Sequence, residues 1–231
     1  MIVKRLKNRL VNFLYFGNRF RNPFYKEFKF LFDYIPKGAV ILEAGAHSGS
    51  DTIRMSHAFP GSIIHSFEPE PTAYKKLIKK TYGYKNIHVY NIALGERDEM
   101  RKLYVSKDLL DASSSLLPQT QTSKKIHPGI KLDQSLDVSV RTIDSWAKEN
   151  AVDHIDFMWL DMQGNELRAL KSAKSLLHTV KAIYTEVLKT ETYEGAPLYP
   201  EFKQWMEQEG FIAKIEREVY DEQTNILFIK K

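Results

Sequence analysis

Four acidic side chains stand where apolar runs of the sequence end, and carboxylates at such places can bind cations or take protons. Each run is short and rich in β-branched or aromatic residues, as buried strands are. The four acids are Glu43, Glu68, Asp161 and Glu186. In an open α/β sheet the carboxyl ends of parallel strands face one crevice, where ligands bind. We therefore expect one polar crevice lined by hydrogen-bond acceptors.

A glycine loop follows the first acid. Residues 43–49 read Glu-Ala-Gly-Ala-His-Ser-Gly, so that Gly45 and Gly49 are separated by three residues. Pyrophosphate needs several closely approaching glycine amides, as in Gly-x-Gly-x-x-Gly, and this loop lacks that spacing. A dinucleotide is therefore disfavoured. S-adenosylmethionine, which carries a sulfonium, an ammonium and a ribose diol, suits the acids better. Glu43 is predicted at the ammonium and Glu68 at the ribose.

Each of these residues also has an ordinary structural interpretation. Two glycines at this spacing occur often by chance, Glu68 could complement a helix dipole, and Asp161 could cap the helix that begins near Gly164. Their joint occurrence at successive strand ends favours the cofactor site. Glu43 and Glu68 are also about 25 residues apart, as a βαβ unit with a ribose-binding acid requires.

The elements that would position these residues alternate from Val40 onward. Expected strands cover 40–43, 62–67, 87–93, 155–160 and 180–187, with an antiparallel hairpin of 211–218 and 225–229 at the end. Expected helices cover 51–58, 72–82, 142–150, 164–177 and 200–209. This pattern predicts a Rossmann-like, doubly wound α/β fold with a mostly parallel sheet and helices on both faces. Residues 100–105 are an expected added strand, and 108–139 an expected long loop or partial lid.

Composition and charge limit the remaining possibilities. The 231 residues include no cysteine, so disulfides and thiolate nucleophiles are excluded. Of the net charge of +5, residues 1–35 carry +6, which predicts a basic helical extension before a domain of 36–231. That extension is expected to pack on its own domain or in a homodimer. The alternative is contact with anionic lipid, nucleic acid or glycan. The expected location is cytoplasmic, or peripheral to the inner face of the membrane.

Several motifs together resemble the FkbM-type methyltransferases, over roughly residues 38–230. The motifs are Val40–Gly49, Phe67–Pro71, Ala93–Gly95, Thr142–Asp144 and Asp161–Glu166. The resemblance implies a class I methyltransferase with a seven-stranded sheet. It also implies S-adenosylmethionine-dependent O-methylation of a sugar, a polysaccharide or another small secondary metabolite. The implied partner is thus a small-molecule or glycan substrate.

Carried over by position, the resemblance assigns a cofactor role to matching residues. Glu43, Gly45 and Gly49 would line the methionine end, Asn91 and Ala93 would lie by the adenine, and Asp161 and Gln163 would lie near the methyl group. The full predicted cofactor set is Glu43, Gly45, Ala46, His47, Gly49, Glu68, Pro69, Asn91, Ala93, Asp161, Met162 and Gln163. The chain departs from the commoner pattern at His47, where Asn is frequent, and at Gln163, where Glu is frequent. A carboxylate role at position 163 is thereby removed.

Methyl transfer requires alignment of an acceptor oxygen and loss of its proton. The predicted catalytic residues are Asp161, which leads because of its place in the loop, Glu186 and His47. A histidine has an unperturbed pKa of ~6.5. Proximity without a dedicated base would be the simpler mechanism. A divalent ion on Asp161, Gln163 and Glu186 is the less favoured alternative to hydrogen bonding without metal.

Two other functions remain as alternatives. The sequence pI of about 9.1 suggests a nucleic-acid methyltransferase. Enzymes that methylate base amino groups usually carry an Asn/Asp-Pro-Pro-aromatic loop, however, and here that loop reads Asp-Met-Gln-Gly at 161–164. A nucleic-acid substrate is therefore disfavoured. A non-catalytic Rossmann-like binding module is the second alternative, and intact acids at four strand ends weigh against it.

Overall fold

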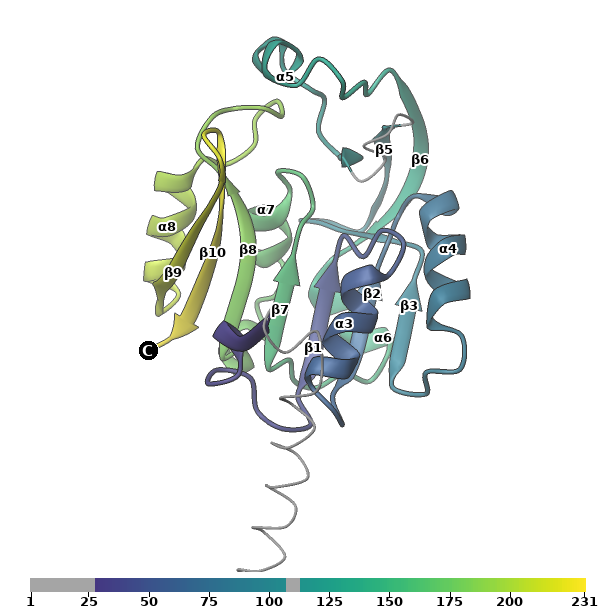
Figure 1. Cartoon of the computed structure of the whole chain (residues 1–231), viewed down its shortest axis with the longest axis vertical. Coiled ribbons are helices and arrows are strands. Elements are labelled where there is room, and N and C mark those ends of the chain that lie inside the picture. The colour runs from purple at the N-terminus through teal and green to yellow at the C-terminus, as the bar shows by residue number, and fades with distance from the viewer. Residues whose placement is uncertain (1–27, 107–112) are drawn as a thin grey trace, which may run out of the picture.

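The computed structural model describes residues 28–106 and 113–231 (Figure 1). Most of the predicted basic extension, residues 1–27, lies outside the described residues, as do residue 107 and residues 108–112 of the predicted lid. Residues 28–35 pack into the domain, with Phe28, Leu31 and Ile35 buried around the 3-10 turn η1 (Lys29–Leu31). In the described part of the chain, no helix has the length and apolar character needed to cross a membrane.

A seven-stranded sheet forms the centre of the fold, in the order β3-β2-β1-β7-β8-β10-β9. Its strands are β1 (Val40–Ala44), β2 (Ile63–Phe67), β3 (Ile87–Tyr90), β7 (Phe157–Leu160), β8 (Ala182–Leu188), β9 (Phe211–Tyr220) and β10 (Gln223–Lys230). The first five of these are parallel, and β10 pairs antiparallel with both β8 and β9. The predicted mostly parallel sheet with a closing hairpin is confirmed.

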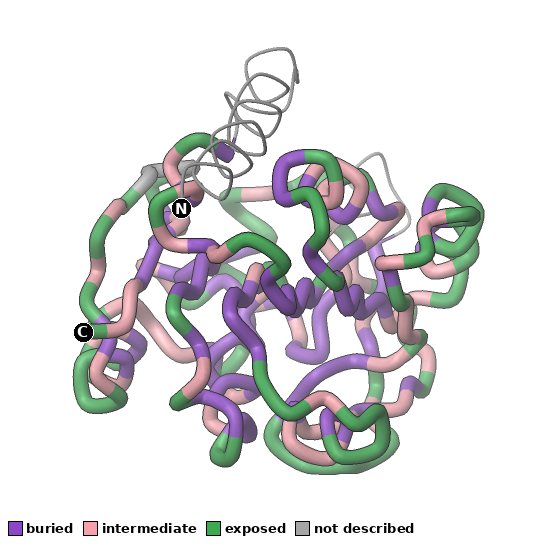
Figure 2. The backbone as a smooth tube through the Cα atoms, turned by 90° about the horizontal axis from the view of Figure 1, so that it is seen from below, coloured by how far each residue is buried: buried purple, intermediate pink, exposed green. Residues whose placement is uncertain are grey.

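Both faces of the sheet are buried, and neighbouring strand residues belong to different cores because side chains alternate along a strand. Ile41 and Phe157 join the core on the side of η1, whereas Leu42 and Met158 join the core on the opposite side. Buried residues accordingly concentrate along the central strands, and exposed residues in the peripheral helices and turns (Figure 2).

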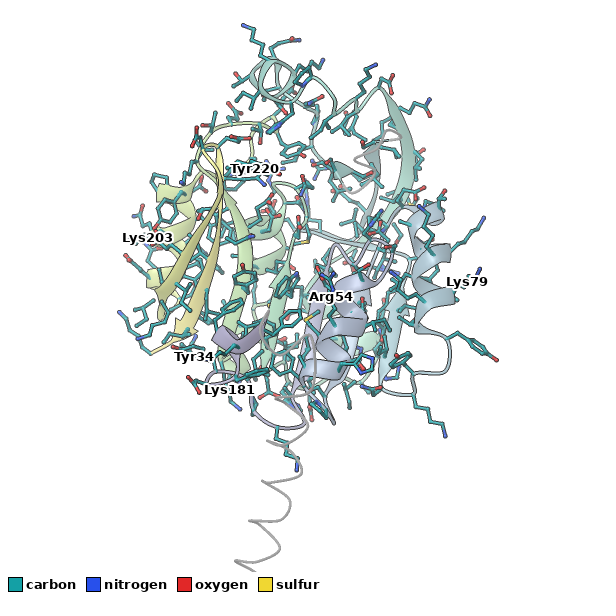
Figure 3. All side chains as sticks on the ribbon, viewed as in Figure 1. Tyr34, Arg54, Lys79, Lys181, Lys203 and Tyr220 are labelled. Carbon is teal, nitrogen blue, oxygen red and sulfur yellow. The ribbon has the colours of Figure 1, made fainter. Side chains whose placement is uncertain are left out.

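Helices cover both faces. They are α3 (Ser50–Ala58), α4 (Pro71–Thr81), α6 (Ile143–Glu149), α7 (Glu166–Leu170) and α8 (Tyr199–Gln208). Helix α3 packs on the η1 side, and α6, α7 and α8 pack on the other side. Charged side chains such as Lys79 and Lys203 point outward (Figure 3). The helix expected through residue 177 ends at Leu170, and short turns lead from there to a 3-10 turn, η3 (Leu177–Thr179).

A second sheet lies above the carboxyl edge of the main sheet (Figure 1). It contains β4 (Ala93–Leu94), β5 (Glu99–Val105) and β6 (Gln134–Arg141), and the segment between β5 and β6 includes helix α5 (Gln121–Ile126). The added strand near 100–105 is confirmed. The expectation of a loop from 108 to 139 is wrong at its end, since 134–139 pair antiparallel with β5. The strand expected over 87–93 is split at Asn91 between the two sheets.

Candidate functional site

A cleft opens at the carboxyl edge of the main sheet, where β1 lies between β2 and β7. It contains about 980 Å³ of empty space, counting the part that is open to solvent. The predicted residues that line it are Gly45, Ala46, His47, Glu68, Pro69, Ala93, Asp161 and Met162. These come from the loops after β1, β2 and β7 and from β4. The strand order thus gathers eight residues that were predicted from separate parts of the sequence.

Gly45 brings two of these loops into backbone contact. Its φ is +88°, in the left-handed region that favours glycine. A Cβ at this position would lie 1.8 Å from the carbonyl oxygen of Asp161. The Gly45 amide also donates to the Phe67 carbonyl at 3.1 Å. Only a residue without a side chain lets the loop after β1 lie against the loop after β7.

Gly49 has a different task, although it was predicted to line the same cleft. It lies outside the cleft lining, at the N-cap of α3, with φ +79°. A Cβ here would lie 2.6 Å from a methyl carbon of Leu77 on α4. Gly49 therefore allows α3 to pack closely against α4. This contact supports the cleft wall on the side that faces away from the cleft.

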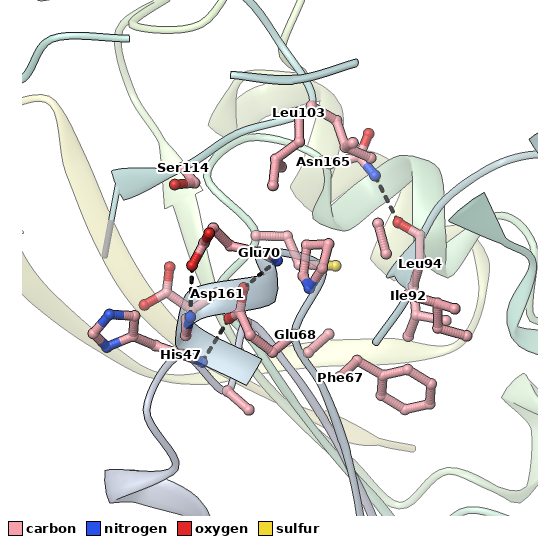
Figure 4. A pocket seen from close by; sticks show the side chains of 18 of the residues that line it. His47, Phe67, Glu68, Glu70, Ile92, Leu94, Leu103, Ser114, Asp161 and Asn165 are labelled. Atoms are coloured by element: carbon pink, nitrogen blue, oxygen red, sulfur yellow. Dashed lines mark hydrogen bonds between the residues drawn. The ribbon is translucent and has the colours of Figure 1, made fainter. Parts of the chain in front are cut away.

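Glu68 links the loop after β1 to the loop after β2. Its carboxylate accepts hydrogen bonds from the backbone amides of His47, at 2.7 Å, and Glu70, at 2.8 Å (Figure 4). His47 has φ +47°, which is uncommon for a residue other than glycine. Glu68 is buried, yet its side chain lines the cleft. An ionised carboxylate can accept about four hydrogen bonds.

Glu43 lies beneath the cleft rather than in it. The Thr52 and Ser66 hydroxyls both donate to Glu43 Oε2 at 2.6 Å, and the residue is only 1 % exposed. Burial raises the pKa of Glu43 to about 7, against the lowering effect of the two hydroxyls. The predicted contact with the ammonium group is thus corrected. Glu43 instead ties β1 to α3 and β2.

Asn91 likewise supports the cleft from outside. Its amide nitrogen donates to the carbonyls of Glu68, at 2.8 Å, and Pro69, at 3.0 Å, which fixes the loop after β2. These bonds occur where the chain leaves β3 for the second sheet. The neighbouring Ile92 and Ala93 line the cleft in place of Asn91.

Asp161, Gln163 and Glu186 form one hydrogen-bonded group beside the cleft. The Gln163 amide nitrogen donates to Asp161 Oδ1 at 2.7 Å and lies 3.4 Å from Glu186 Oε1. The Tyr193 hydroxyl donates to the Gln163 amide oxygen at 2.6 Å, and Ser115 donates to the Gln163 carbonyl at 2.7 Å. Gln163 and Glu186 lie outside the cleft lining. Of the three, only Asp161 faces the cleft directly.

Burial raises the pKa of several acids in this region. Asp161 is open to the cleft, but protein on its other sides removes water and raises its pKa, as does the charge of Asp51. Burial also raises the pKa of Glu186, and the charges of Asp161 and Glu166 add to this shift. Glu166, which accepts from the Met162 amide, has its pKa raised to about 7 by burial. A carboxyl with a raised pKa is a stronger base near neutral pH.

The predicted metal alternative can be compared with these contacts. Among residues 28–106 and 113–231, no group of three or more His, Asp or Glu side chains could hold a metal ion. The Gln163 amide nitrogen points at both carboxylates, Asp161 and Glu186. An N–H donor thus occupies the direction from which a cation would be bound. The arrangement fits hydrogen bonding without metal.

Sequence reasoning missed the apolar part of the cleft and some of its polar lining. The missed residues are Ala44, Ser48, Ser50, Asp51, Phe67, Glu70, Ala73, Ile92, Leu94, Leu103, Ser114, Leu116 and Asn165. The alternation of residues 101–105 could have identified Leu103, which is buried in β5. Nothing in the sequence reveals that this strand reaches the cleft, because the fold of the second sheet decides it.

Comparisons with known proteins identify the family. The methyltransferase FkbM domain matches residues 43–213. The 2-O-methyltransferase NoeI of Sinorhizobium fredii is 28% identical over 160 residues, which cover 68% of this chain and 66%, just under two thirds, of the relative. The chain belongs to the FkbM methyltransferase family, and residues 43–213 form an S-adenosylmethionine-dependent methyltransferase domain.

Solved structures agree on the fold alone. A fibrillarin pre-rRNA processing protein of Methanococcus jannaschii has a TM-score of 0.52 and 15% identity, covering 85% of this chain and 68% of that one. A chain of a fibrillarin/Nop5p complex has a TM-score of 0.50 and 16% identity, covering 85% of this chain and 75% of that one. The predicted Rossmann-like methyltransferase fold is confirmed.

Replacing Gly45 with Ala should abolish cofactor binding. The new Cβ must push the loop away from the Asp161 carbonyl, and this moves two walls of the cleft. Gly83→Ala is a matched control, because Gly83 has φ +89° but no atom within 4 Å of the place its Cβ would take. Calorimetry with S-adenosylmethionine should show no binding to the first variant and unchanged binding to the second. Equal affinities in both variants would show that the close contact is not needed.

Replacing Glu43 with Gln should flatten the pH dependence of stability. The folded protein holds the Glu43 proton up to a pKa of about 7, whereas the ordinary value is 4.5. Folding is therefore favoured at low pH, and this contribution is lost as pH rises from 4.5 to 7. Relative to the wild type, the free energy of unfolding of Glu43→Gln should gain about 2 to 3 kcal/mol between pH 5 and pH 8. Urea denaturation measures it, with exposed Glu207→Gln as the control. Parallel curves for wild type and Glu43→Gln would contradict the buried titration.

Proposed function

We propose that this chain is an O-methyltransferase that transfers the methyl group of S-adenosylmethionine to a hydroxyl of a sugar, a polysaccharide or another small metabolite. The observation that carries the proposal is the position of Glu68 and Asp161 on one cleft, with the Gly45 contact between their loops. The cleft lies at the carboxyl ends of the strands, where open α/β sheets bind their ligands. The 2-O-methyltransferase name of the relative NoeI supports the choice of oxygen as the acceptor.

The described residues fit the parts of the cofactor. Carboxylate oxygens of Glu68 can accept hydrogen bonds from a ribose diol. Apolar side chains such as Leu94 and Leu103 offer a surface for an aromatic base. Figure 4 places Asp161 on the same side as Glu68 and His47, away from Leu94 and Leu103, and a cationic group bound there would be stabilised. When bound, S-adenosylmethionine supplies an electrophilic methyl group on sulfur.

Asp161 is the group that accepts the proton of the acceptor hydroxyl in this proposal. It is exposed to the cleft, and the protein on its other sides removes water and raises its pKa, which strengthens it as a base near neutral pH. The Gln163 amide nitrogen donates to Asp161 Oδ1 at 2.7 Å. The other carboxylate oxygen of Asp161 can point to the substrate. The same Gln163 amide nitrogen lies 3.4 Å from Glu186 Oε1, on the side away from the cleft. His47, the third predicted catalytic residue, lines the cleft next to Glu68 and is not needed as a base.

The polar groups that line the cleft together with Asp161 also suit a hydroxyl-bearing acceptor such as a sugar. Ser114, Asp161 and Met162 line the cleft, and Ser115 joins the segment of Ser114 to the loop after β7 through the Gln163 carbonyl. Hydroxyl and carboxylate groups alternate with apolar ones, as expected for a ring that carries several hydroxyls. Methyl transfer to a panel of monosaccharides and oligosaccharides, read by mass spectrometry, tests the acceptor. Exclusive methylation of RNA would favour the nucleic-acid alternative instead.

Replacing Glu68 with Ala should weaken S-adenosylmethionine binding by about 10- to 100-fold, because charge-assisted hydrogen bonds to the ribose are lost. Glu70→Ala removes a neighbouring carboxylate of the same wall, which caps α4 through the Ala73 amide. This control should lose some stability but keep its affinity within about threefold. Isothermal titration calorimetry gives both constants. Similar losses of affinity in Glu68→Ala and Glu70→Ala would mean that the total negative charge of this wall sets the affinity, and not the position of Glu68.

Replacing Asp161 with Asn should separate binding from chemistry. The Asn oxygen can still accept from the Gln163 amide, so the cleft keeps its shape. With an acceptor from the panel, kcat should fall by about 100-fold or more, while the Kd of S-adenosylmethionine changes only a few-fold. Glu222→Gln, in the turn before β10, serves as a control that lowers nearby negative charge. An unchanged kcat in Asp161→Asn would mean that the reaction proceeds by proximity alone.

A further inference from the structure

The Tyr193 side chain is a buried polar group that the proposed mechanism does not use. Its hydroxyl donates to the Gln163 amide oxygen at 2.6 Å, and the residue is 5 % exposed. Its ring packs in a small apolar cluster with Leu117, Leu188 and Ala196. The packing holds the hydroxyl in one place, directed at Gln163.

The backbone around Tyr193 is attached to two parts of the site. Tyr193 forms an isolated β-bridge with Gln119, and the Glu194 amide donates to the Pro118 carbonyl at 2.8 Å. A Cβ at Gly164 would lie 3.4 Å from the Tyr193 Cβ. Tyr193 therefore contacts both the segment between β5 and β6 and the loop after β7, which carries Gln163.

The Gln163 amide satisfies its neighbours in only one orientation. Its nitrogen donates to Asp161 Oδ1 at 2.7 Å and lies 3.4 Å from Glu186 Oε1. Carboxylate oxygens accept and a hydroxyl can donate, so the nitrogen faces the acids and the oxygen faces Tyr193. The Gln163 backbone is held as well, because Ser115 donates to its carbonyl at 2.7 Å.

The buried acid next to Gln163 gives the Tyr193 hydroxyl a purpose. Burial raises the pKa of Glu186 well above its ordinary value, and the charge of Asp161 adds to this shift. A protonated Glu186 can donate a hydrogen bond, and a free Gln163 amide could then turn its oxygen towards it. That turn would take the N–H away from Asp161. Burial also raises the pKa of Tyr193, so its hydroxyl keeps its proton and remains a donor.

We propose that Tyr193 is a positioning residue that acts through Gln163: its hydroxyl holds the amide with the N–H on Asp161, and so keeps this carboxylate ionised and directed for the reaction. The inference rests on the proposed function, in which Asp161 takes the proton of the acceptor hydroxyl. Tyr193 lies outside the cleft lining, so its effect on the reaction must pass through Gln163. Loss of the hydroxyl frees the amide and removes stabilisation from the ionised form of Asp161.

The first test follows the titration of Asp161 by carbon-13 NMR of the aspartate carboxyl groups, in the full chain without ligand and with EDTA. Asp161→Asn identifies the Asp161 signal by its absence. In Tyr193→Phe the midpoint of the Asp161 titration should move to higher pH. The substitution leaves the other ionisable groups around Asp161 in place, which are Asp51 on α3, Glu166 at the start of α7, Glu186 on β8, and His47 and Glu68 on the same side of the cleft.

Tyr199→Phe is the matched control. The Tyr199 hydroxyl also donates to a side-chain oxygen at 2.6 Å, that of Glu216, but it lies on α8 and outside the cleft lining. This variant should leave the Asp161 titration unchanged. Thermal denaturation checks that each variant folds. If Tyr193→Phe does not fold, Tyr193→Met takes its place with the same expected shift.

A double-mutant cycle tests the route through Gln163. Gln163→Leu removes the amide and should move the Asp161 midpoint to higher pH at least as far as Tyr193→Phe does. Adding Tyr193→Phe to Gln163→Leu should cause no further shift, because the hydroxyl then has no amide to hold.

Methyl transfer gives a second readout, with an acceptor from the sugar panel. Near pH 6 the kcat of Tyr193→Phe should fall by about threefold or more, because less Asp161 is ionised there. At pH 9, where Asp161 is ionised in both proteins, kcat should stay within about twofold of the wild type. The Kd of S-adenosylmethionine should be unchanged.

The outcomes separate the two proposals. A protein whose Asp161 titrates as expected but which methylates no acceptor counts against the proposed function alone. An unchanged Asp161 midpoint in Tyr193→Phe overturns the positioning role, whatever the activity. A further shift on adding Tyr193→Phe to Gln163→Leu overturns it too, since the hydroxyl would then act by another route. A kcat that falls equally at every pH would show a general structural role instead.

Discussion

The geometry of the site depends on a contact between two backbone segments, at Gly45 after β1 and Asp161 after β7. No atom larger than hydrogen fits between Gly45 and the Asp161 carbonyl, since a Cβ would lie 1.8 Å from that oxygen. The contact is available because α3 and α7 leave the sheet on opposite faces, so that no helix covers the ends of β1 and β7. Both residues then become neighbours in one cleft wall, and the distance between their loops is set by van der Waals contact of the backbones rather than by side chains.

The acids at equivalent strand ends nevertheless have different roles, because they differ in how far they are buried and in what surrounds them. Glu43 is fully enclosed and satisfied by two hydroxyls, so it stabilises the junction of β1, β2 and α3. Glu68 is buried but faces the cleft, and it joins two loops while offering acceptors. Glu186 acts from a second layer through Gln163. Position at a strand end thus predicts where an acid lies, and its surroundings decide whether a ligand can reach it.

The sequence predicted the parts of the fold that depend on local pattern. Strand ends, glycine positions and the closing hairpin follow from hydrophobic runs and turn residues, and these placed Gly45, Glu68 and Asp161 correctly at one edge. The second sheet was not predictable in the same way. Its strand β6 pairs with β5 about 35 residues earlier, and the charged, exposed start of β6 resembles a loop until that partner is known. Asn165 was missed for a similar reason, since its bond to Leu94 joins segments 71 positions apart.

Gln163 explains how so many acids coexist in one loop region. The resemblance to the family leads to an expectation of Glu at this position, and a third carboxylate here would face Asp161 and Glu186 directly. The amide instead presents an N–H donor to both, and the Tyr193 hydroxyl fixes its direction. Burial raises the pKa of Asp161 and of Glu186, the charge of Asp161 adds to the shift at Glu186, and the Gln163 donor opposes the shift at Asp161. The Gln163 amide thus opposes the rise in the pKa of Asp161 without adding a third carboxylate to the loop. The departure from the common pattern removes a charge from the loop but supports the one carboxylate that faces the cleft.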